Sequence, residues 1–376
     1  MIKLAWRQFQ LDQMRSLLTA IAVGMVIAVI LVIEGFEQGQ YYQLKNIVLK
    51  RNADLVVTQS GVTNFIAVRS SIPQLSRGDV ELVKGVKTAH PITAVPIIYN
   101  KNNIRTPVYV LVYDVKGGPS SIIYGNEIKN GKDIVIDESL AKKYNIKLGD
   151  SFLVTDFEFK VSGITREAAF MMPFAFINYD GMLDLFIESE IAPDLSTFPL
   201  LSYMLIELYP NADPDNVSRL IEKNVPDVDV ITPTGLAEND INMGKLFFGP
   251  IMGLLVSIAY IIGMLVVGLI MYGDIRSRLK SFAVLKALGF SSGKLFTAVL
   301  MQSLLLLLVA IPVGTILALS LSIYIETTAP VYLIRIFEPS VFIQTLAASV
   351  GFAFIGALIP LRIVLKSDPV MAFQGA

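Results

Sequence analysis

The sequence predicts an α-helical membrane protein with a large α+β domain between its first and second membrane-spanning helices. The first observation is a set of four apolar runs, at residues 17–37, 246–272, 295–325 and 341–365. Each run supplies the about 20 apolar residues that a helix needs to cross a bilayer. The second observation is that residues 38–245 are more polar and alternate strand-like with helix-like patterns. The remaining predictions depend on this one-plus-three arrangement of spans around a folded insert.

The composition agrees with a membrane protein and argues against several kinds of site. Of the 376 residues, 53% are hydrophobic and 17% are charged, which is too apolar for a soluble chain of this length. The net charge of −1 argues against nucleic acid as a partner. The chain has no cysteine and one histidine, His90, so disulfides and zinc–thiolate, iron–sulfur or histidine-rich metal sites are not expected. We expect neither a catalytic residue nor a metal site.

The distribution of Lys and Arg predicts the orientation. Basic residues are in excess before the first span, between the second and third spans, and after the fourth. The connection at 326–340 instead has Glu326, Arg335 and Glu338. Because positively charged short segments stay in the cytoplasm, both termini and the connection at 273–294 are expected there, with the insert outside. Four spans fit this pattern.

These patterns divide the chain into nine parts. They are a cytoplasmic amphipathic helix at 1–16, transmembrane helices at 17–37, 246–272, 295–325 and 341–365, an extracytoplasmic α+β domain at 38–245, a cytoplasmic loop at 273–294, an outer loop at 326–340 and a cytoplasmic tail at 366–376.

The first apolar run follows positive residues, as a signal peptide does. No small-x-small cleavage pattern comes after it, so we expect a retained helix. Before it, residues 2–15 have apolar side chains near helical spacing. Two interpretations stay open for this segment: a simple extension of the first span, or an interfacial helix that lies on the membrane.

The insert reads as a folded domain with short strands and short helices. Strands are expected at 54–58, 92–99, 108–114, 133–136, 157–161 and 203–208. Helices are expected to begin at Ser76, Asp137 and Asp213, where a capping side chain precedes acidic residues of the first turn. The apolar stretch at 168–176 (AAFMMPFAF) is either a buried strand or a surface for a hydrophobic cargo or adaptor protein.

The connection at 273–294 carries the strongest local signal for function. Basic residues follow the second span, and residues 283–289 (AVLKALG) predict a helix that Gly289 ends. This stretch resembles the cytoplasmic loop of the permease family that includes the macrolide exporter MacB, the division protein FtsX, the lipoprotein-releasing permeases, and the DevC and HrtB exporters. The segment at 134–150 with 159–164, and the tail DPVMAFQ at 368–374, are similar to further parts of that family. The resemblance covers essentially the whole chain.

One position departs from the family pattern. Many members carry an acidic residue where this chain has Ser281, so a contact to the ATPase is either missing or made elsewhere. The next position, Phe282, fits DevC- and HrtB-like members better than MacB. MacB also fuses its ATPase to the permease, whereas we expect the ATPase here in a separate chain.

The resemblance implies a permease subunit of an ABC transporter in the bacterial cytoplasmic (inner) membrane. Such a subunit works as a dimer, most simply a homodimer, beside separate ATPase chains that bind ATP and Mg. A periplasmic adaptor and an outer-membrane channel are further partners that the family allows. The expected ATPase-coupling residues are Arg276, Arg278, Lys280, Phe282, Lys286 and Gly289.

The expected activity is export or extraction of a hydrophobic or amphipathic compound, such as haem, a lipid, a glycolipid or a drug. The family is thought to move its outer domain mechanically, so the two spans that flank the insert are the natural levers. The alternative is mechanotransmission without transport, which regulates an outer partner such as a cell-wall hydrolase.

Glu34 is the only ionisable residue well inside an apolar run. A charge there costs roughly 2.5–3.5 kcal/mol at mid-membrane and less near the interface. It either reaches the outer head groups along with Glu37, or belongs to a substrate or dimer interface with Met25 and Glu37. A methionine and a carboxylate could ligate haem, as the HrtB resemblance suggests. However, nine residues separate Met25 from Glu34, which places them on opposite sides of a helix.

Overall fold

The computed structural model describes residues 13–66, 68–190, 200–277, 284, 286 and 288–366. The chain divides into two compact units. The helical unit comprises Met1–Gln38, Pro250–Thr327 and Ile334–Ala376. The α+β unit comprises Gly39–Gly249 and Thr328–Leu333. The predicted amphipathic helix before the first span lies almost entirely outside the described residues.

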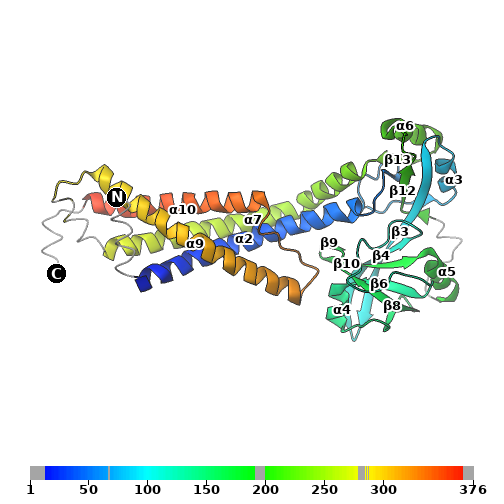
Figure 1. The fold of residues 1–376 in the computed structure, drawn as a ribbon, viewed down its shortest axis with the longest axis horizontal. Helices are drawn as coiled ribbons and strands as arrows, with labels where there is room; N and C mark the ends of the chain where they lie inside the picture. The colour runs from blue at the N-terminus through cyan, green and yellow to red at the C-terminus, as the bar shows by residue number, and fades with distance from the viewer. Residues whose placement is uncertain are drawn as a thin grey trace. The chain divides into compact units, whose positions relative to one another are not determined.

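The helical unit is built from long apolar helices that lie side by side (Figure 1). They are α2 (Gln13–Leu49), α7 (Pro233–Ser277), α9 (Ser292–Thr328) and α10 (Pro339–Lys366). Among the described residues, three stretches are long and apolar enough to cross a membrane: Leu17–Leu49, Pro233–Ile270 and Gly293–Thr328. The fourth helix, α10, is also apolar, but its described side chains end at 355. The count of four spans therefore stays a prediction.

Small residues let the helices of this unit approach closely. A Cβ added to Gly314 of α9 would lie 2.7 Å from the carbonyl oxygen of Gly24 on α2. A Cβ on Gly263 of α7 would lie 2.9 Å from Val26 and 3.0 Å from Phe352. Because lipid tails are as apolar as leucine, close packing of this kind is a main source of association between helices in a membrane.

The α+β unit is organised around a mixed sheet. Its strands are β1 (Leu55–Gln59), β3 (Val86–Lys101), β4 (Ile104–Tyr113), β5 (Tyr124–Gly125), β6 (Asp133–Asp137), β7 (Ser151–Val154), β8 (Phe157–Thr165), β9 (Ala168–Ala169), β10 (Met172–Asn178), β12 (Tyr203–Leu208) and β13 (Val228–Ile231). The main path runs β13-β1-β12-β3-β4-β10-β6-β8-β5. The β4/β10 and β6/β8 pairs are parallel, and the other neighbours on this path are antiparallel. A separate short pair joins β2 (Ile72–Pro73) to β11 (Leu200–Leu201).

The two faces of the sheet pack against different helices. On β4, Val110 and Val112 belong to one core, whereas Leu111 belongs to the core on the opposite face. The first face is covered by the four short helices α3 (Ser76–Glu81), α4 (Glu138–Tyr144), α5 (Tyr179–Glu188) and α6 (Pro214–Asn224) (Figure 1). The opposite face packs on the end of α2, through Leu44 and Val48, and on the start of α7, through Leu236.

The six predicted strands are confirmed, with longer bounds for most of them. Helices α3, α4 and α6 begin where the sequence predicts, and the Asp137 side chain caps α4 by accepting from the Ser139 amide at 2.8 Å. The capping predicted at the other two starts is wrong, because Ser76 is the first helical residue of α3 and Asp213 makes no side-chain capping hydrogen bond. Residues 172–178 form the buried strand β10, which is one of the two interpretations of the stretch at 168–176. The sequence analysis missed the helix α5 and the strands β2, β5, β7, β11 and β13.

Candidate functional site

Glu34 is buried inside the helical unit. The residue belongs to α2 and is 7% exposed. The Tyr260 hydroxyl on α7 donates to one carboxylate oxygen, and the Thr345 hydroxyl on α10 donates to the other at 3.2 Å. The carboxylate thus joins three helices, because an ionisable group in an apolar bundle needs hydrogen-bond partners. Both interpretations of Glu34, at the outer head groups or at a substrate or dimer interface, stay predictions.

The neighbouring backbone holds the segment between α9 and α10. The Arg335 amide donates to the Gly35 carbonyl at 2.9 Å. A Cβ on Gly35 would lie 3.1 Å from the Ile336 nitrogen, so this approach depends on glycine. Glu326 accepts from the Ile334 amide at 2.8 Å. The segment therefore packs closely on α2, directly beside Glu34.

The other two residues predicted for a substrate or dimer interface lie in different surroundings. Met25 is 53% exposed on the surface of the helical unit, and Glu37 is partly exposed. The structure does not bring Met25 together with Glu34 within one copy. Their role at a partner copy or a substrate stays a prediction.

The connection at 273–294 is described in part. Arg276 is exposed in the last turn of α7, and Lys286 is partly exposed. Gly289 has a φ of +87°, and its amide donates to the Lys286 carbonyl at 3.1 Å, as expected of a glycine that ends a helical turn. Arg278, Lys280 and Phe282 lie outside the described residues. Their coupling role, like that of Arg276, Lys286 and Gly289, stays a prediction.

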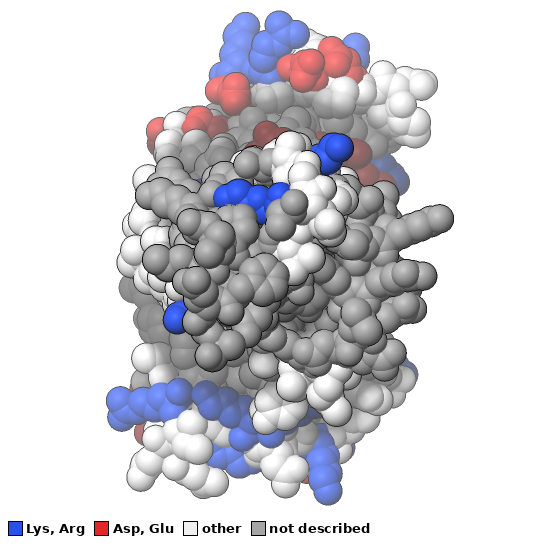
Figure 2. Space-filling view, turned by 90° about the vertical axis from the view of Figure 1, so that its left-hand side faces the viewer, with Lys and Arg blue, Asp and Glu red and all other residues white. Residues whose placement is uncertain are grey.

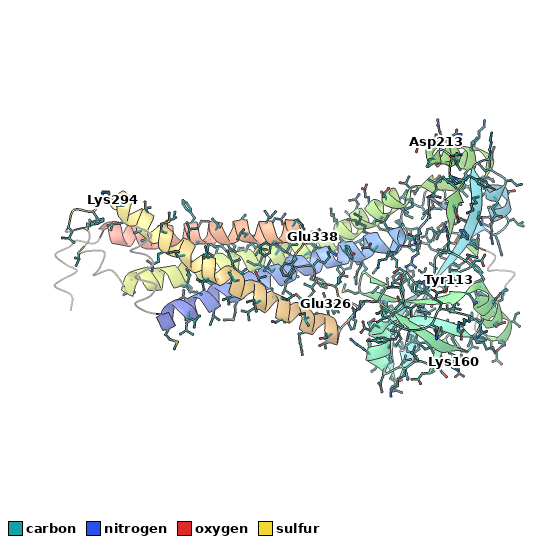
Figure 3. The ribbon with its side chains drawn as sticks, viewed as in Figure 1. Tyr113, Lys160, Asp213, Lys294, Glu326 and Glu338 are labelled. Atoms are coloured by element: carbon teal, nitrogen blue, oxygen red, sulfur yellow. The ribbon has the colours of Figure 1, made fainter. Side chains whose placement is uncertain are left out.

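This end of the helical unit carries basic side chains. Figure 2 views the molecule from this end and shows blue Lys and Arg side chains among grey residues that are not described. Figure 3 places Lys294 at this end of α9, Glu326 at the other end of the same helix, and Glu338 beside the start of α10. The cytoplasmic location expected from the basic residues at this end stays a prediction.

A buried ion pair fastens the end of α2 to the sheet. Arg51 follows the last turn of α2, and its guanidinium contacts the Glu167 carboxylate, with side chains 1% and 4% exposed. Arg51 also donates to the carbonyls of Ile47 at 2.9 Å and Gly117 at 3.1 Å. Glu167 directly precedes β9. The end of α2 is therefore connected to the sheet by a charged pair that is almost completely removed from water.

The same cluster extends to Asp137 at the end of β6. The Glu167 amide donates to Asp137 at 2.8 Å, and the Ser139 amide donates to the same carboxylate at 2.8 Å. Burial raises the pKa of Asp137 to about 6, although these hydrogen bonds to the carboxylate oppose the shift. Hydrogen bonds thus link Arg51 through Glu167 to a central strand.

A second buried carboxylate fastens the start of α7. Asp240 is 2% exposed and accepts from the amides of Phe65 at 3.0 Å and Ile66 at 3.4 Å. The Tyr203 hydroxyl on β12 donates to the Phe65 carbonyl at 2.7 Å. Burial raises the pKa of Asp240 to about 7. The loop after β1 is therefore held between α7 and the sheet.

The sequence analysis predicted neither the Arg51–Glu167 ion pair nor the hydrogen bonds of Asp240. Arg51 and Glu167 are 116 residues apart, so no local pattern connects them. Asp240 stands among other polar residues at the start of α7 and has no distinguishing neighbour in the sequence. Among the described residues, no group of three or more His, Asp or Glu side chains is placed to hold a metal ion.

The fold and these contacts define a membrane protein whose α+β unit is built on the ends of two apolar helices. A family model described as the MacB-like periplasmic core domain matches residues 16–224, and one described as the FtsX-like permease C-terminal matches residues 253–369. The chain therefore belongs to the MacB/FtsX-type family of ABC transporter permeases, as the resemblance in its sequence predicted. It is an ABC transporter permease subunit.

Two similar permeases match the chain over its full length. An uncharacterised ABC transporter permease of Mycobacterium tuberculosis is 22% identical over 379 residues and covers 100% of both chains. The HrtB permease protein of Staphylococcus haemolyticus, named for a hemin transport system, is 23% identical and covers 100% of this chain and 99% of its own. The extracellular domain of the transporter YknZ from Gram-positive bacteria matches 48% of this chain and 100% of its own, at 12% identity and a TM-score of 0.36. The periplasmic region of MacB from Actinobacillus actinomycetemcomitans matches 49% of this chain and 91% of its own, at 10% identity and a TM-score of 0.35.

Proposed function

We propose that this permease subunit exports or extracts a hydrophobic or amphipathic compound by mechanotransmission. A separate ATPase chain binds Mg-ATP and hydrolyses it beside the connection at 273–294. Two copies of the permease, each with four spans and both termini in the cytoplasm, form the membrane part of the complex in the bacterial inner membrane. The proposed cargo is haem, a lipid, a glycolipid or a drug, with haem supported by the name of the HrtB relative.

One observation carries this proposal: α2 and α7 are continuous helices that each contribute to both units. Residues 13–38 of α2 belong to the helical unit and residues 39–49 to the α+β unit, and α7 passes from one unit to the other after Gly249. A continuous helix transmits displacement along its axis because its hydrogen bonds resist stretching and bending.

Both helices are also fastened firmly at their outer ends. Arg51 and Glu167 hold the end of α2, and Asp240 holds the loop at Phe65 to the start of α7. Transmission of motion along the helices needs such rigid contacts, because a flexible connection between a helix and the sheet would absorb the displacement. ATP can drive a conformational change of the complex only if it binds the two conformations with different free energies.

The test uses the permease reconstituted with its ATPase in lipid nanodiscs. ATP hydrolysis is measured with haem, phospholipids, glycolipids and lipopeptides, together with ATP-dependent transfer of the stimulating compound to an acceptor outside the disc. We expect one compound class to stimulate hydrolysis at least several-fold and to be transferred. No stimulation and no transfer by any compound, together with ATP-dependent activation of a cell-wall hydrolase, would establish the non-transport alternative.

A further inference from the structure

The β9–β10 hairpin of the α+β unit has two large apolar residues at its turn, where the backbone geometry favours other residue types. Phe170 and Met171 join the two strands and have φ values of 51° and 62°. Tight hairpin turns of this geometry strongly prefer asparagine, aspartate and glycine, since large side chains are strained at positive φ. Strained backbone of this kind persists where surrounding contacts enforce it. We therefore expect contacts outside the turn to hold Phe170 and Met171 in this geometry.

Phe170 is seated in a notch between α2 and α7. Its ring centroid lies 4.3 Å from that of Phe248 on α7. A Cβ on Gly244 would lie 2.8 Å from the Phe170 ring and 2.8 Å from Leu44 of α2. Gly244 thus leaves the space that the ring fills, and Phe170 packs on α7 within the apolar cluster that also contains Leu44 of α2.

The notch lies where the apolar run of α7 begins. Leu246 and Phe247 flank this point and are 68% and 62% exposed. Between Gly244 and Leu246, the Lys245 ammonium group stands 5.7 Å from the centre of the Tyr41 ring. Tyrosine and lysine at the end of an apolar run are typical of the head-group level of a membrane. This composition is what we expect where α7 enters lipid, and Phe170 of the hairpin turn packs against Phe248 at this point of the helix.

Met171 continues this apolar surface beyond Phe170. It is 37% exposed, and Met172 is partly exposed. We propose that the tip of this hairpin, Met171 with Met172, inserts among lipids of the outer leaflet beside α7. Methionine suits such a contact because it is flexible and apolar and adapts to irregular surroundings. The inference needs α7 to span the membrane and is independent of the cargo.

The lack of cysteine in the chain allows a direct test, since an introduced thiol is unique. Met171→Cys in the full chain is spin-labelled and reconstituted in phosphatidylcholine–phosphatidylglycerol nanodiscs. The accessibility of the label to oxygen, which concentrates in lipid, is compared with its accessibility to a water-soluble nickel chelate. Leu254→Cys, 61% exposed in the apolar part of α7, is the lipid control. Ile187→Cys, 73% exposed on α5, is the water control.

We expect the Met171 label to give an oxygen-to-nickel accessibility ratio within about twofold of the Leu254 label and at least about fivefold above the Ile187 label. A ratio equal to that of Ile187 overturns the proposal, because the tip then lies in water. Exclusion of both reagents also overturns it, because protein then covers the tip. If Met171→Cys does not yield a monodisperse protein, Met172→Cys is read by the same criteria.

Discussion

Arg51 and Glu167 form an ion pair that is almost completely removed from water, with side chains 1% and 4% exposed. The pair joins the end of α2 to the start of β9, and the Ser120 amide also donates to Glu167. A buried pair of this kind is not by itself strongly stabilising, because both charges lose their hydration. Breaking it is costly, since the remaining charge is left without a partner.

This relationship predicts a large loss of stability from single substitutions. Arg51→Met should lower the free energy of unfolding by about 3–5 kcal/mol, because Glu167 stays buried and unpaired. The double substitution Arg51→Met with Glu167→Met should cost less than either single one. Lys132→Met, in a pair with Glu188 whose side chains are 59% and 52% exposed, should change stability by less than about 1 kcal/mol. Thermal unfolding of the full chain in nanodiscs measures all four, and a double variant that is less stable than both singles would contradict the argument.

The second prediction concerns pH and Asp240. Burial raises the pKa of this carboxyl from 3.8 to about 7, while the amides of Phe65 and Ile66 oppose the shift. The groups that face it include the Tyr109 and Tyr203 hydroxyls, whose own pKa values burial raises. Between pH 4 and 7 the folded state binds this proton more tightly than the unfolded state, so the Asp240 contribution to stability falls as pH rises through that window.

Asp240→Asn should remove this dependence while keeping an acceptor for the two amides. The variant should gain stability relative to the wild type on going from pH 5 to pH 8, by up to about 1.4 kcal/mol for each pH unit below the folded pKa. Thermal unfolding midpoints of both proteins at pH 5, 6, 7 and 8 measure the difference. A difference that stays constant over this range would show that Asp240 does not titrate there.

The sequence specified the α+β unit better than the helical unit. Strands such as β4 and β12 were predictable because their apolar residues pack on both faces of the sheet, and α4 was predictable because Asp137 is a capping residue. The short strands β7 and β13, of 4 residues each, were missed because so few residues establish no period. In the helical unit, an almost uniformly apolar run has no distinct face, so the inward direction of Glu34 could not be read from it.

The third prediction concerns the close approach of α2 and α9. Gly314→Ala should destabilise the helical unit, because the new Cβ would lie 2.7 Å from the Gly24 carbonyl oxygen and backbone cannot move aside cheaply. Gly253→Ala is the matched control, since a Cβ there meets nothing within 4 Å. The expected cost at Gly314 is about 1–3 kcal/mol, from overpacking. Equal unfolding midpoints for the two variants would contradict this account of the packing.

The fourth prediction concerns coupling at the cytoplasmic end. Lys286→Ala should weaken association with the ATPase or reduce the hydrolysis that cargo stimulates, because this residue lies in the basic connection where we propose that the ATPase docks. Lys160→Ala, an exposed residue of β8 in the α+β unit, removes the same charge elsewhere and should leave coupling unchanged. Co-purification of the ATPase and cargo-stimulated hydrolysis measure both effects. Unchanged values for Lys286→Ala would remove this residue from the coupling site.

The last prediction concerns the hydrogen bonds that join α2, α7 and α10. Glu34→Leu should destabilise the helical unit by about 1–3 kcal/mol, because the hydroxyls of Tyr260 and Thr345 lose their acceptor in an apolar bundle. Glu34→Gln keeps an acceptor oxygen and should cost less. Adding Tyr260→Phe to Glu34→Leu should restore part of the loss, since it removes a hydroxyl that has no partner. Thermal unfolding in nanodiscs measures the three variants, and a Glu34→Leu protein as stable as the wild type would show that these hydrogen bonds do not hold the helices together.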